Sequence, residues 1–371
     1  MEEEKYMWRC LQLASNGLCG AAPNPMVGAV IVCDGQIIGE GYHVRCGEAH
    51  AEVNAIRSVR HPELLKRSTI YVSLEPCAHY GKTPPCADLL IEKQIPRIVI
   101  GCQDPFARVA GRGIQKLKDA GREVVTGVLE RECRFLIRRF ITFHTQHRPY
   151  ITLKWAQSSD GYIDRPRTTN EKQPARLSSP LTSMLVHKRR TEHAAIMVGT
   201  HTALLDNPSL TVRHWYGKNP VRVVPDRNLD LPDTLRLFDG SAPTLVFTES
   251  KQRPKRPGTE YADTDFGQDT LPQILHELHR RNLQSLLVEG GRRLLQSFLD
   301  AGLWDEIYVE TSPQRLGYGV EAPHTDSSIP HAEYTFLGHN FRRFLSPRLA
   351  AEAPEELLPI GKNRHIIYNF V

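Results

Sequence analysis

The chain contains 371 residues, of which 40% are hydrophobic and 24% are charged, and its formal net charge is +5 at pH 7. The length is enough for two or three domains, and the composition is that of an ordinary globular protein rather than a disordered, collagen-like or disulfide-rich one. Because the charge is mild and no run of about 18 apolar residues occurs, we expect neither a nucleic-acid partner nor a membrane span.

The cysteines are unevenly distributed along the chain. All eight lie between Cys10 and Cys133, and the rest of the chain contains none. This asymmetry suggests two units of different origin. The cysteine spacing shows no paired disulfide framework, and the acidic N-terminus lacks an apolar signal core, so we expect a reducing, cytoplasmic location.

The first part of the chain alternates aliphatic runs with segments of helical periodicity. A first helix is expected where apolar residues recur from Met7 to Ala14, and Asp34-Gly35 is expected to close a hairpin. The expected strands cover residues 26–33, 37–42, 69–74, 97–101 and 123–126, and further helices cover residues 50–59, 85–93, 113–120 and 130–144. Such alternation predicts a three-layer α/β/α domain with its site at the carboxyl ends of strands.

A histidine and two cysteines in this part have the spacing of a catalytic zinc site. His50 falls at the start of an expected helix, and Cys77 follows Pro76 at the end of an expected strand. Catalytic zinc takes three protein ligands and keeps one position for water, whose pKa it lowers toward neutrality. We therefore predict zinc on His50, Cys77 and Cys86. Glu52 would carry a proton from the water to a leaving amine.

Two other interpretations compete with this one. His50 could be a hydrogen-bonded core histidine, with Cys77 and Cys86 as small buried hydrophobic residues. A purely structural zinc site is the second, but it lacks a fourth Cys or His nearby and gives Glu52 no role. The combination of His-x-Glu with Pro-Cys favours the catalytic interpretation.

The loop between the two cysteines is longer than coordination requires. Zinc deaminases commonly place two residues between these cysteines, whereas eight separate Cys77 from Cys86 here. The loop carries His79 and Lys82, whose cations would suit an anionic group on the substrate, such as phosphate. The alternative is a solvated loop in which the lysine is incidental.

The composition shifts near His147-Arg148-Pro149, so we expect one domain over residues 1–147 and another over residues 148–371. In the second half, strands are expected at residues 150–155, 195–198, 221–224, 244–247, 285–288 and 365–370, and helices at residues 181–192, 271–281 and 292–301. Residues 253–269, rich in proline, glycine and charge, are expected to form a loop. This series of strands and helices predicts a second α/β domain.

Three segments of the second half follow strands and precede turns or helices. They run from Lys154 to Gly161, from Gly199 to Arg213, and from Val288 to Gly291. Exposed N–H groups at a helix start suit phosphate, and glycines let a dinucleotide approach the backbone closely. Because no Gly-x-Gly-x-x-Gly fingerprint follows a strand, a standard Rossmann site is not expected.

Charged residues near these segments could bind the same ligand. Arg190 and Arg213 could hold a phosphate through paired hydrogen bonds, or they could be surface charges. Lys154 is a candidate proton donor, or it could belong to a structural ion pair. The Gly290-Gly291 pair could likewise be a plain turn.

With these motifs in view, the chain resembles the bifunctional deaminase-reductases of riboflavin biosynthesis over nearly its full length. The resemblance rests on the three segments above and, in the first half, on Pro23-Asn24-Pro25-x-Val27-Gly28, Gly39-x-Gly41-x-His43, His50-Ala51-Glu52, the loop from Glu75 to Cys86, and Gln103-Asp104-Pro105 with Gly111-Arg112-Gly113. It implies an N-terminal cytidine-deaminase-like domain, which would deaminate a phosphoribosylated diaminopyrimidine. A C-terminal domain similar to dihydrofolate reductase would then reduce the ribose to a ribityl chain with NADPH.

The resemblance also implies roles for individual residues, and we expect a homo-oligomer. Zinc would lie on His50, Cys77 and Cys86, Glu52 would shuttle the proton, and the deaminase substrate would contact Asn24, His43 and Lys82. The reductase substrate would contact Arg190, Leu210, Arg213 and Glu289. The cofactor NADPH would lie near Lys154, Ala156, Arg176, Thr202, Asp206, Arg227, Gly291, Arg292, Arg293, Leu294, Leu295, Gln296 and Ser297.

The chain departs from the family's pattern at two places in the second half. Members carry Ser-x-Trp-Ile-Thr-Ser where this chain reads Pro174-Ala175-Arg176-Leu177-Ser178-Ser179, so Arg176 replaces a tryptophan expected near the cofactor. A strand expected to end Val-Leu-Asp reads Val224-Pro225-Asp226, although proline cannot donate a ladder hydrogen bond. Arg227 then replaces a small residue, and an arginine beside an NADPH phosphate could help binding.

Two other functions compete with this one. A deaminase of tRNA or of a free base with an appended binding domain is disfavoured by the long loop bearing Lys82 and by the lack of a basic, aromatic-rich surface signal. A C-terminal half that serves as a non-catalytic ligand-binding or assembly module is kept open by Arg176 and Pro225.

Overall fold

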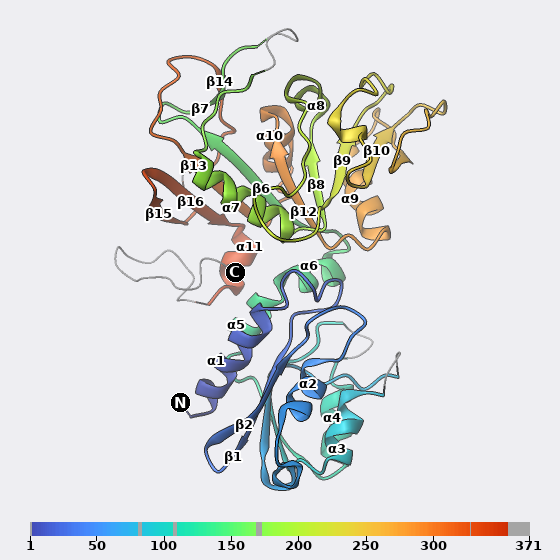
Figure 1. Ribbon diagram of the computed structural model, residues 1–371, viewed down its shortest axis with the longest axis vertical. Helices are drawn as coiled ribbons and strands as arrows, with labels where there is room; N and C mark the ends of the chain where they lie inside the picture. Colours follow the sequence, from blue (N-terminus) through green and yellow to red (C-terminus); the bar gives the residue numbers. More distant parts are fainter. Residues whose placement is uncertain (1, 81–83, 107–109, 168–172, 327, 355–371) are drawn as a thin grey trace. The chain divides into compact units, whose positions relative to one another are not determined.

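The computed structural model describes residues 2–80, 84–106, 110–167, 173–326 and 328–354. The chain forms two compact units, one reaching Gln146 and the other spanning His147 to Ala351 (Figure 1). Within the described ranges, no helix combines the length and apolar character needed to cross a bilayer. Lys82 and the expected strand at residues 365–370 lie outside the described residues.

The first unit is built on a five-stranded sheet with the order β2-β1-β3-β4-β5. Its strands are β1 (Gly28–Cys33), β2 (Gln36–Tyr42), β3 (Thr69–Leu74), β4 (Arg97–Cys102) and β5 (Glu123–Thr126). The pairs β1–β2 and β1–β3 are antiparallel, whereas β3–β4 and β4–β5 are parallel. The helices are α1 (Glu2–Ser15), α2 (Ala51–Ser58), α3 (Cys86–Glu92), α4 (Arg112–Asp119), α5 (Glu130–Leu136) and α6 (Arg138–Gln146), with a 3-10 turn η1 (Pro62–Arg67).

Helices cover both faces of this sheet, as the strand sequences require. Successive residues of a strand point to opposite faces, and both sets are apolar in β1 and β4. Ile31 and Ile98 pack with α2, α3 and α4, whereas Val99 packs with α1 and α5. Figure 1 shows these two groups of helices on opposite sides of the strands. The predicted three-layer α/β/α arrangement is confirmed.

Most of the expected elements of this unit are present, with ends shifted by one or two residues. The hairpin is confirmed, because Asp34 and Gly35 both have positive φ, of 50° and 76°, between β1 and β2. The single helix expected over residues 130–144 is wrong. It is two helices, α5 and α6, because Ile137 departs from helical geometry with φ −95° and ψ 19°.

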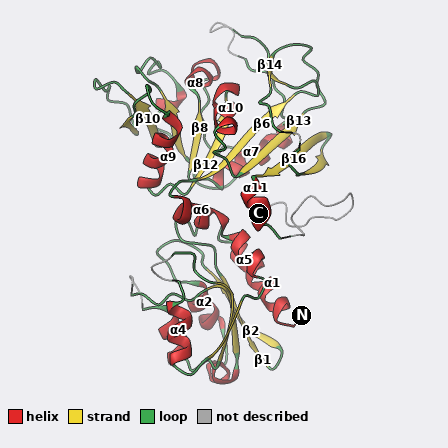
Figure 2. Ribbon diagram, turned by 180° about the vertical axis from the view of Figure 1, so that it is seen from behind, coloured by secondary structure: helices red, strands yellow, loops and turns green. Residues whose placement is uncertain are grey.

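The second unit contains a nine-stranded sheet with the order β11-β10-β9-β8-β12-β6-β13-β16-β15. Figure 2 labels β10, β8, β12, β6, β13 and β16 of this sheet. Its strands are β6 (Tyr150–Gln157), β8 (Ala195–Val198), β9 (Val221–Pro225), β10 (Thr244–Thr248), β11 (Thr259–Asp263), β12 (Ser285–Gly290), β13 (Glu306–Thr311), β15 (His331–Phe336) and β16 (His339–Leu345). A separate ribbon pairs β7 (Tyr162–Asp164) with β14 (Val320–Glu321). The helices are α7 (Pro180–Thr191), α8 (Thr200–Asp206), α9 (Thr270–Arg280), α10 (Arg292–Asp300) and α11 (Pro347–Glu352), with a 3-10 turn η2 (Arg236–Phe238).

The strands from β11 to β13 in this order are parallel, and β16 and β15 complete the sheet as antiparallel strands. Parallel sheets are buried on both faces, so their central strands are almost continuously apolar. Val288 of β12 packs with α9 and α10, whereas its neighbour Leu287 packs in a second core with Ala203 of α8. The carboxyl ends of β6, β8, β9 and β12 therefore share one edge, where open α/β sheets bind ligands.

Two sequence expectations for this unit need comment. The loop expected over residues 253–269 is confirmed except at Thr259–Asp263, where β11 forms and pairs with β10 as the last strand of the sheet. Such an edge position tolerates charged residues like Glu260 and Asp263. Pro225 is accommodated because it ends β9, and its carbonyl accepts a hydrogen bond from Thr200 Oγ1 at 2.5 Å.

Candidate active sites

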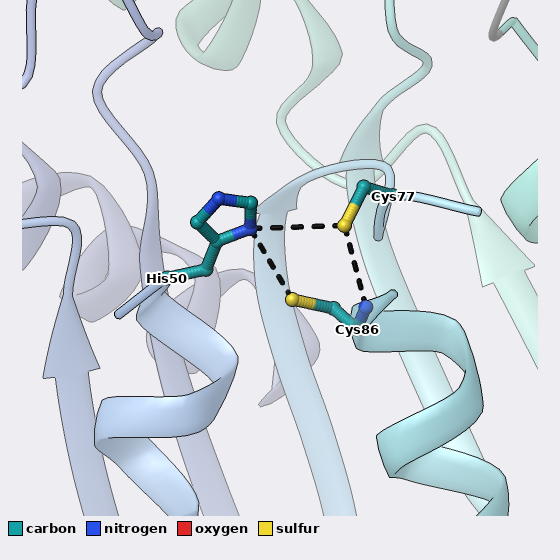
Figure 3. Close-up of side chains that lie close together, drawn as sticks. All are labelled: His50, Cys77 and Cys86. Carbon is teal, nitrogen blue, oxygen red and sulfur yellow. Dashed lines mark hydrogen bonds between the residues drawn. The ribbon is translucent and has the colours of Figure 1, made fainter. Parts of the chain in front are cut away.

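The three predicted metal ligands of the first unit lie together (Figure 3). Their ligand atoms are all within 4.8 Å of one another, and His50 Nδ1 is 3.7 Å from Cys77 Sγ and 3.4 Å from Cys86 Sγ. A tetrahedral zinc ion with Zn–S bonds of about 2.3 Å and Zn–N bonds of about 2.0 Å separates these atoms by about 3.6 Å. Both the donor set and its spacing therefore fit zinc. No second group of this kind is found among the residues that the structure describes.

Each ligand is placed by the end of a helix or a strand. His50 directly precedes α2, Cys77 is the third residue after β3, and Cys86 is the first residue of α3. The backbone N–H of Cys86 donates to Cys77 Sγ at 3.3 Å, and the N–H of Ala87 donates to the Cys77 carbonyl at 3.1 Å. The side chain of Cys86 and then His50 lower the pKa of Cys77, which favours the thiolate form that binds metal.

Glu52 lies beside this cluster, in the first turn of α2, and is 3% exposed. Burial, reinforced by the nearby charge of Cys77, raises the pKa of Glu52 to about 7. A carboxyl group that titrates near neutral pH can both accept and return a proton. The structure therefore places the predicted proton shuttle at the predicted metal site.

His43 is buried, and both of its ring nitrogens have partners within the protein. Nδ1 is 3.1 Å from the Ala49 carbonyl, and Nε2 is 3.1 Å from Asn24 Nδ2. The Ala49 carbonyl can only accept a hydrogen bond and the Asn24 NH₂ group can only donate one. The His43 ring is therefore assigned as neutral, with its proton on Nδ1. Burial lowers the pKa of His43, which favours the same neutral state. The ring packs edge-on against His50 with centroids 5.3 Å apart, so Asn24 and His43 reach the metal cluster.

The loop between the two cysteines is only partly described. His79 is exposed on the described part, whereas Lys82 lies outside the described residues. The predicted contact between Lys82 and an anionic substrate group therefore stays a prediction.

In the second unit, the predicted glycine-rich segment meets the start of α8. Gly291 has φ +70°, and a Cβ atom there would lie 2.8 Å from Thr202 Oγ1. The N–H of Gly199 donates to the Gly290 carbonyl at 3.3 Å. Position 291 therefore favours glycine both for its conformation and for the closeness of Thr202. Two predicted cofactor residues, Thr202 and Gly291, come together here.

A buried charged group lies at the same edge of the sheet. Arg190 donates to Glu289 through Nε at 3.0 Å and Nη2 at 2.6 Å, and to the Thr211 carbonyl through Nη1 at 3.0 Å. Burial alone would raise the pKa of Glu289, but Arg190 and Lys154 hold it below its ordinary value. Burial lowers the pKa of Lys154, and Glu289 opposes this. The interpretation of Arg190 as a surface charge is wrong, because its side chain is 12% exposed.

The other predicted substrate residues of this unit differ in exposure. Leu210 is buried and Arg213 is exposed. The backbone N–H of Arg213 donates to His187 Nδ1 at 3.1 Å, so His187 ties this segment to α7. Sequence reasoning missed His187, although it lies three residues before Arg190 and hence on the same face of a helix.

Two predicted cofactor residues are held in ion pairs. Asp206 pairs with Arg167, whose Nε also donates to Asp164 Oδ2 at 2.7 Å. Nothing in the sequence pattern indicated Arg167. Arg227 follows β9 with its side chain 56% exposed, and its Nε is 2.8 Å from Glu249 Oε2.

The remaining predicted cofactor residues are spread along the unit. Arg176 is exposed ahead of α7, and Ala156 is half-buried near the end of β6. On α10, Leu295 is buried in the core, and Leu294 lies beside Gly199. The other positions on α10 make polar contacts with neighbouring groups, and they are Arg292, Arg293, Gln296 and Ser297. The structure thus brings part of the predicted cofactor set together around Thr202 and leaves part of it dispersed.

Two family models match the chain. The model for the cytidine and deoxycytidylate deaminase zinc-binding region matches residues 1–102, and the model for the RibD C-terminal domain matches residues 149–338. The first range contains all three predicted metal ligands. Together the matches confirm a cytidine-deaminase-like domain followed by a reductase domain.

Similar proteins match over most of the chain. Riboflavin biosynthesis protein RibD of Aquifex aeolicus is 40% identical, over 86% of this chain and 89% of its own length. The RibD protein of Bacillus amyloliquefaciens is 39% identical, over 90% and 92%. A crystal structure of a diaminohydroxyphosphoribosylaminopyrimidine deaminase/5-amino-6-(5-phosphoribosylamino)uracil reductase from Thermotoga maritima superposes with a TM-score of 0.83, at 38% identity, covering 93% of this chain and 99% of that one. A structure of Acinetobacter baumannii RibD gives 0.81 at 31% identity, covering 93% and 98%.

Proposed function

As a member of the RibD family of riboflavin biosynthesis proteins, this chain is a deaminase and a reductase, and we propose which residues perform each step. The proposed substrate is 2,5-diamino-6-(5-phosphoribosylamino)pyrimidin-4-one, matching the activities for which the Thermotoga protein is named. Deamination comes first, and the ribosyl group is then reduced to ribityl. We assign deamination to residues 1–147 and reduction to residues 148–371. The two family matches and the division into units after Gln146 support this assignment.

For the deamination step, we assign the metal to His50, Cys77 and Cys86. When bound there, zinc lowers the pKa of a coordinated water and so makes hydroxide available at neutral pH. Glu52 accepts the proton from this water and delivers it to the leaving amine. The observation that carries the proposal is the spacing of the three donor atoms beside a carboxyl group whose pKa is about 7.

The substrate ring is proposed to bind next to His43 and Asn24. These two side chains are bonded to each other and pack against His50, so they form a fixed polar wall beside the cluster. The loop that carries Lys82 would then contact the phosphate of the substrate. This last contact rests on the sequence alone.

For the reduction step, we place the cofactor phosphates at the Gly290–Gly291 backbone and the start of α8. When bound, NADPH supplies the hydride. Arg190 and Glu289 form a rigid charged pair facing the substrate, and Lys154 is the proposed proton donor. The depressed pKa of Lys154 supports this role, since burial makes its ammonium group readier to release a proton.

The deaminase proposal is tested by replacing Glu52 with glutamine in the full chain. We expect Glu52→Gln to keep about one zinc per chain but to lose deamination by roughly 100- to 10,000-fold, since general acid–base catalysis contributes on that scale. Reduction of the deaminated substrate serves as the internal control. Full deaminase activity in this variant would remove Glu52 from the mechanism.

The reductase proposal is tested by NADPH oxidation with the deaminated phosphoribosyl compound. We expect oxidation at a rate that follows protein concentration. Absence of oxidation, with deamination intact, would favour a C-terminal half that binds without catalysis. The expected homo-oligomer and cytoplasmic location stay predictions, which light scattering and cell fractionation would check.

A further inference from the structure

The carboxylate of Glu75 takes part in neither of the proposed steps, yet it is buried at the edge of the deaminase site. It lies between the end of β3 and the ligand Cys77, and the residue is 5% exposed. The sequence singled out Glu75 and two other segments, Gln103-Asp104-Pro105 and Gly111-Arg112-Gly113, without giving them a role. The structure joins all three.

The joining contacts are four hydrogen bonds from backbone N–H groups. Glu75 Oε2 accepts from Asp104 at 3.2 Å and Gly111 at 3.0 Å. Glu75 Oε1 accepts from Gly113 at 2.9 Å and Ile114 at 3.2 Å. Both oxygens are therefore fully used as acceptors, and only a carboxylate can accept four such bonds at once.

The two glycines allow the backbone to come this close. Gly111 has φ +77°, the left-handed region that favours glycine. A Cβ atom on Gly113 would lie 2.0 Å from the Pro76 carbonyl oxygen, which no side chain could tolerate without moving the backbone. The start of α4 is thus pressed directly against Pro76, the residue before the metal ligand.

Cys77 is therefore fixed from two sides. On one side, Glu75 and Pro76 are bound to the segment that begins α4. On the other, Cys86 and Ala87 at the start of α3 donate N–H groups to Cys77 Sγ and its carbonyl, at 3.3 Å and 3.1 Å.

We propose that Glu75 is a positioning residue of the deaminase, which holds Cys77 at bonding distance from the metal shared with His50 and Cys86. The inference rests on the proposed zinc site. Groups outside the ligand set that orient a metal ligand change metal affinity by about 10- to 100-fold when they are replaced. Glu75 acts on the ligand's backbone rather than on its sulfur, so its effect is one of geometry.

The test compares Glu75→Gln with Glu92→Gln in the full chain. A glutamine at position 75 presents an NH₂ group to two N–H donors, so at least two of the four bonds are lost. Glu92 is the matched control: it is an exposed residue at the end of α3, bonded to the neighbouring Lys93, and its replacement removes the same charge. Zinc affinity is measured by competition with a chelator, and the geometry of the site by the absorption spectrum of the cobalt(II)-loaded protein.

We expect Glu75→Gln to bind zinc about 10- to 100-fold more weakly and to shift the thiolate-to-cobalt bands, with reduction of the deaminated substrate unchanged. Glu92→Gln should match the wild type throughout. Wild-type zinc affinity and cobalt spectrum in Glu75→Gln would overturn the proposal and leave Glu75 a structural cap, even if the protein melted at lower temperature.

A milder variant decides the case if Glu75→Gln does not fold. Gly111→Ala strains one donor of the set, because alanine disfavours the φ of +77° at this position. The change is mild because the added Cβ would meet a side-chain atom, Gln103 Nε2 at 2.9 Å, rather than the backbone. It should shift the cobalt spectrum in the same direction by a smaller amount, and an unshifted spectrum would contradict the proposal. A wild-type protein that takes up no metal would instead refute the proposed function itself.

Discussion

The two units build their sites in opposite ways. In the deaminase, three ligand atoms within 4.8 Å of one another and one buried carboxyl form a compact group on ends of neighbouring elements. In the reductase, the candidate residues lie on several strands and helices, and several of their charges are already paired within the unit, in the buried pair Arg190–Glu289 and the more exposed pair Arg227–Glu249. A metal centre needs particular side chains at particular distances, whereas a dinucleotide site uses backbone and replaceable charges.

The largest effect expected from this comparison comes from removing one metal ligand. Cys86→Ala deletes one of the three metal ligands, so we expect loss of zinc and a fall in deamination of roughly a thousandfold or more. Because the reductase residues are untouched, NADPH oxidation with the deaminated substrate should persist. Metal analysis and the two separate assays check this.

The control for that variant is Cys46→Ser, since Cys46 is exposed in the same unit and is no part of the cluster. It should keep zinc and both activities. Equal loss of deamination in the two variants would mean that thiol chemistry other than metal binding supports the reaction.

This contrast explains which parts of the sites could be predicted from sequence. His50, Cys77 and Cys86 were found because metal binding restricts residue type and spacing, and strand and helix ends then place them. The role of Glu75 was not predicted because its partners are backbone N–H groups, which any residue type can supply. The only sequence signal is the pair of glycines, Gly111 and Gly113, that lets the backbone come close. The link from Arg167 to the predicted cofactor residue Asp206 could not be found, because the two residues are distant in sequence.

The same distinction holds for the fold. The parallel strands were predicted from continuous aliphatic runs such as residues 285–288. The strands β13, β15, β16 and the edge strand β11 were not predicted. Their sequences mix charged residues such as Glu306 and Arg343 into the strand, and these pair with each other across β13 and β16 only once the sheet has formed.

The second prediction tests whether the buried charge pair of the reductase is needed for stability, for reduction, or for both. Arg190→Met leaves the buried Glu289 without its partner, and breaking such a pair costs about 3–5 kcal/mol. We expect reductase activity to be lost at lower urea concentration, with deamination unaffected. The double variant Arg190→Met/Glu289→Leu should regain stability but not reduction. Recovery of reduction in the double variant would remove this pair from the substrate site.

The third prediction concerns pH, and it depends on His187. Burial first, and then the nearby side chains of Arg190, Arg213 and His214, lower the pKa of His187 to about 4, against the opposing charge of Glu289. The folded pKa is below the unfolded value of about 6.5, so the unfolded chain binds more protons between these limits. The contribution of neutral His187 to the free energy of unfolding is therefore fully present above pH 6.5 and is lost as pH falls toward 4.

The expected loss for His187 is about 2 kcal/mol at most between pH 7 and pH 5. In His187→Gln, the side-chain oxygen can still accept the Arg213 N–H but does not titrate. The urea midpoint of reductase inactivation should therefore depend less on pH in the variant than in the wild type. Parallel pH profiles for the two proteins would contradict the assignment.

The smallest effect is expected where the reductase departs from its family, at Arg227. Its exposed guanidinium stands at the carboxyl end of β9, two residues after Pro225, whose carbonyl is bonded to Thr200 at the start of α8. If Arg227 contacts the 2′-phosphate of NADPH, one charged hydrogen bond of about 1.5 kcal/mol is lost in Arg227→Ser, which raises KM for NADPH about tenfold. KM for NADH should not change, because NADH lacks that phosphate.

Glu249→Gln frees the arginine without removing it, so its KM for NADPH should stay equal or fall. Equal changes in KM for NADPH and NADH in Arg227→Ser would mean that Arg227 does not contact the 2′-phosphate. Arg227 would then be only a partner of Glu249 in a surface ion pair.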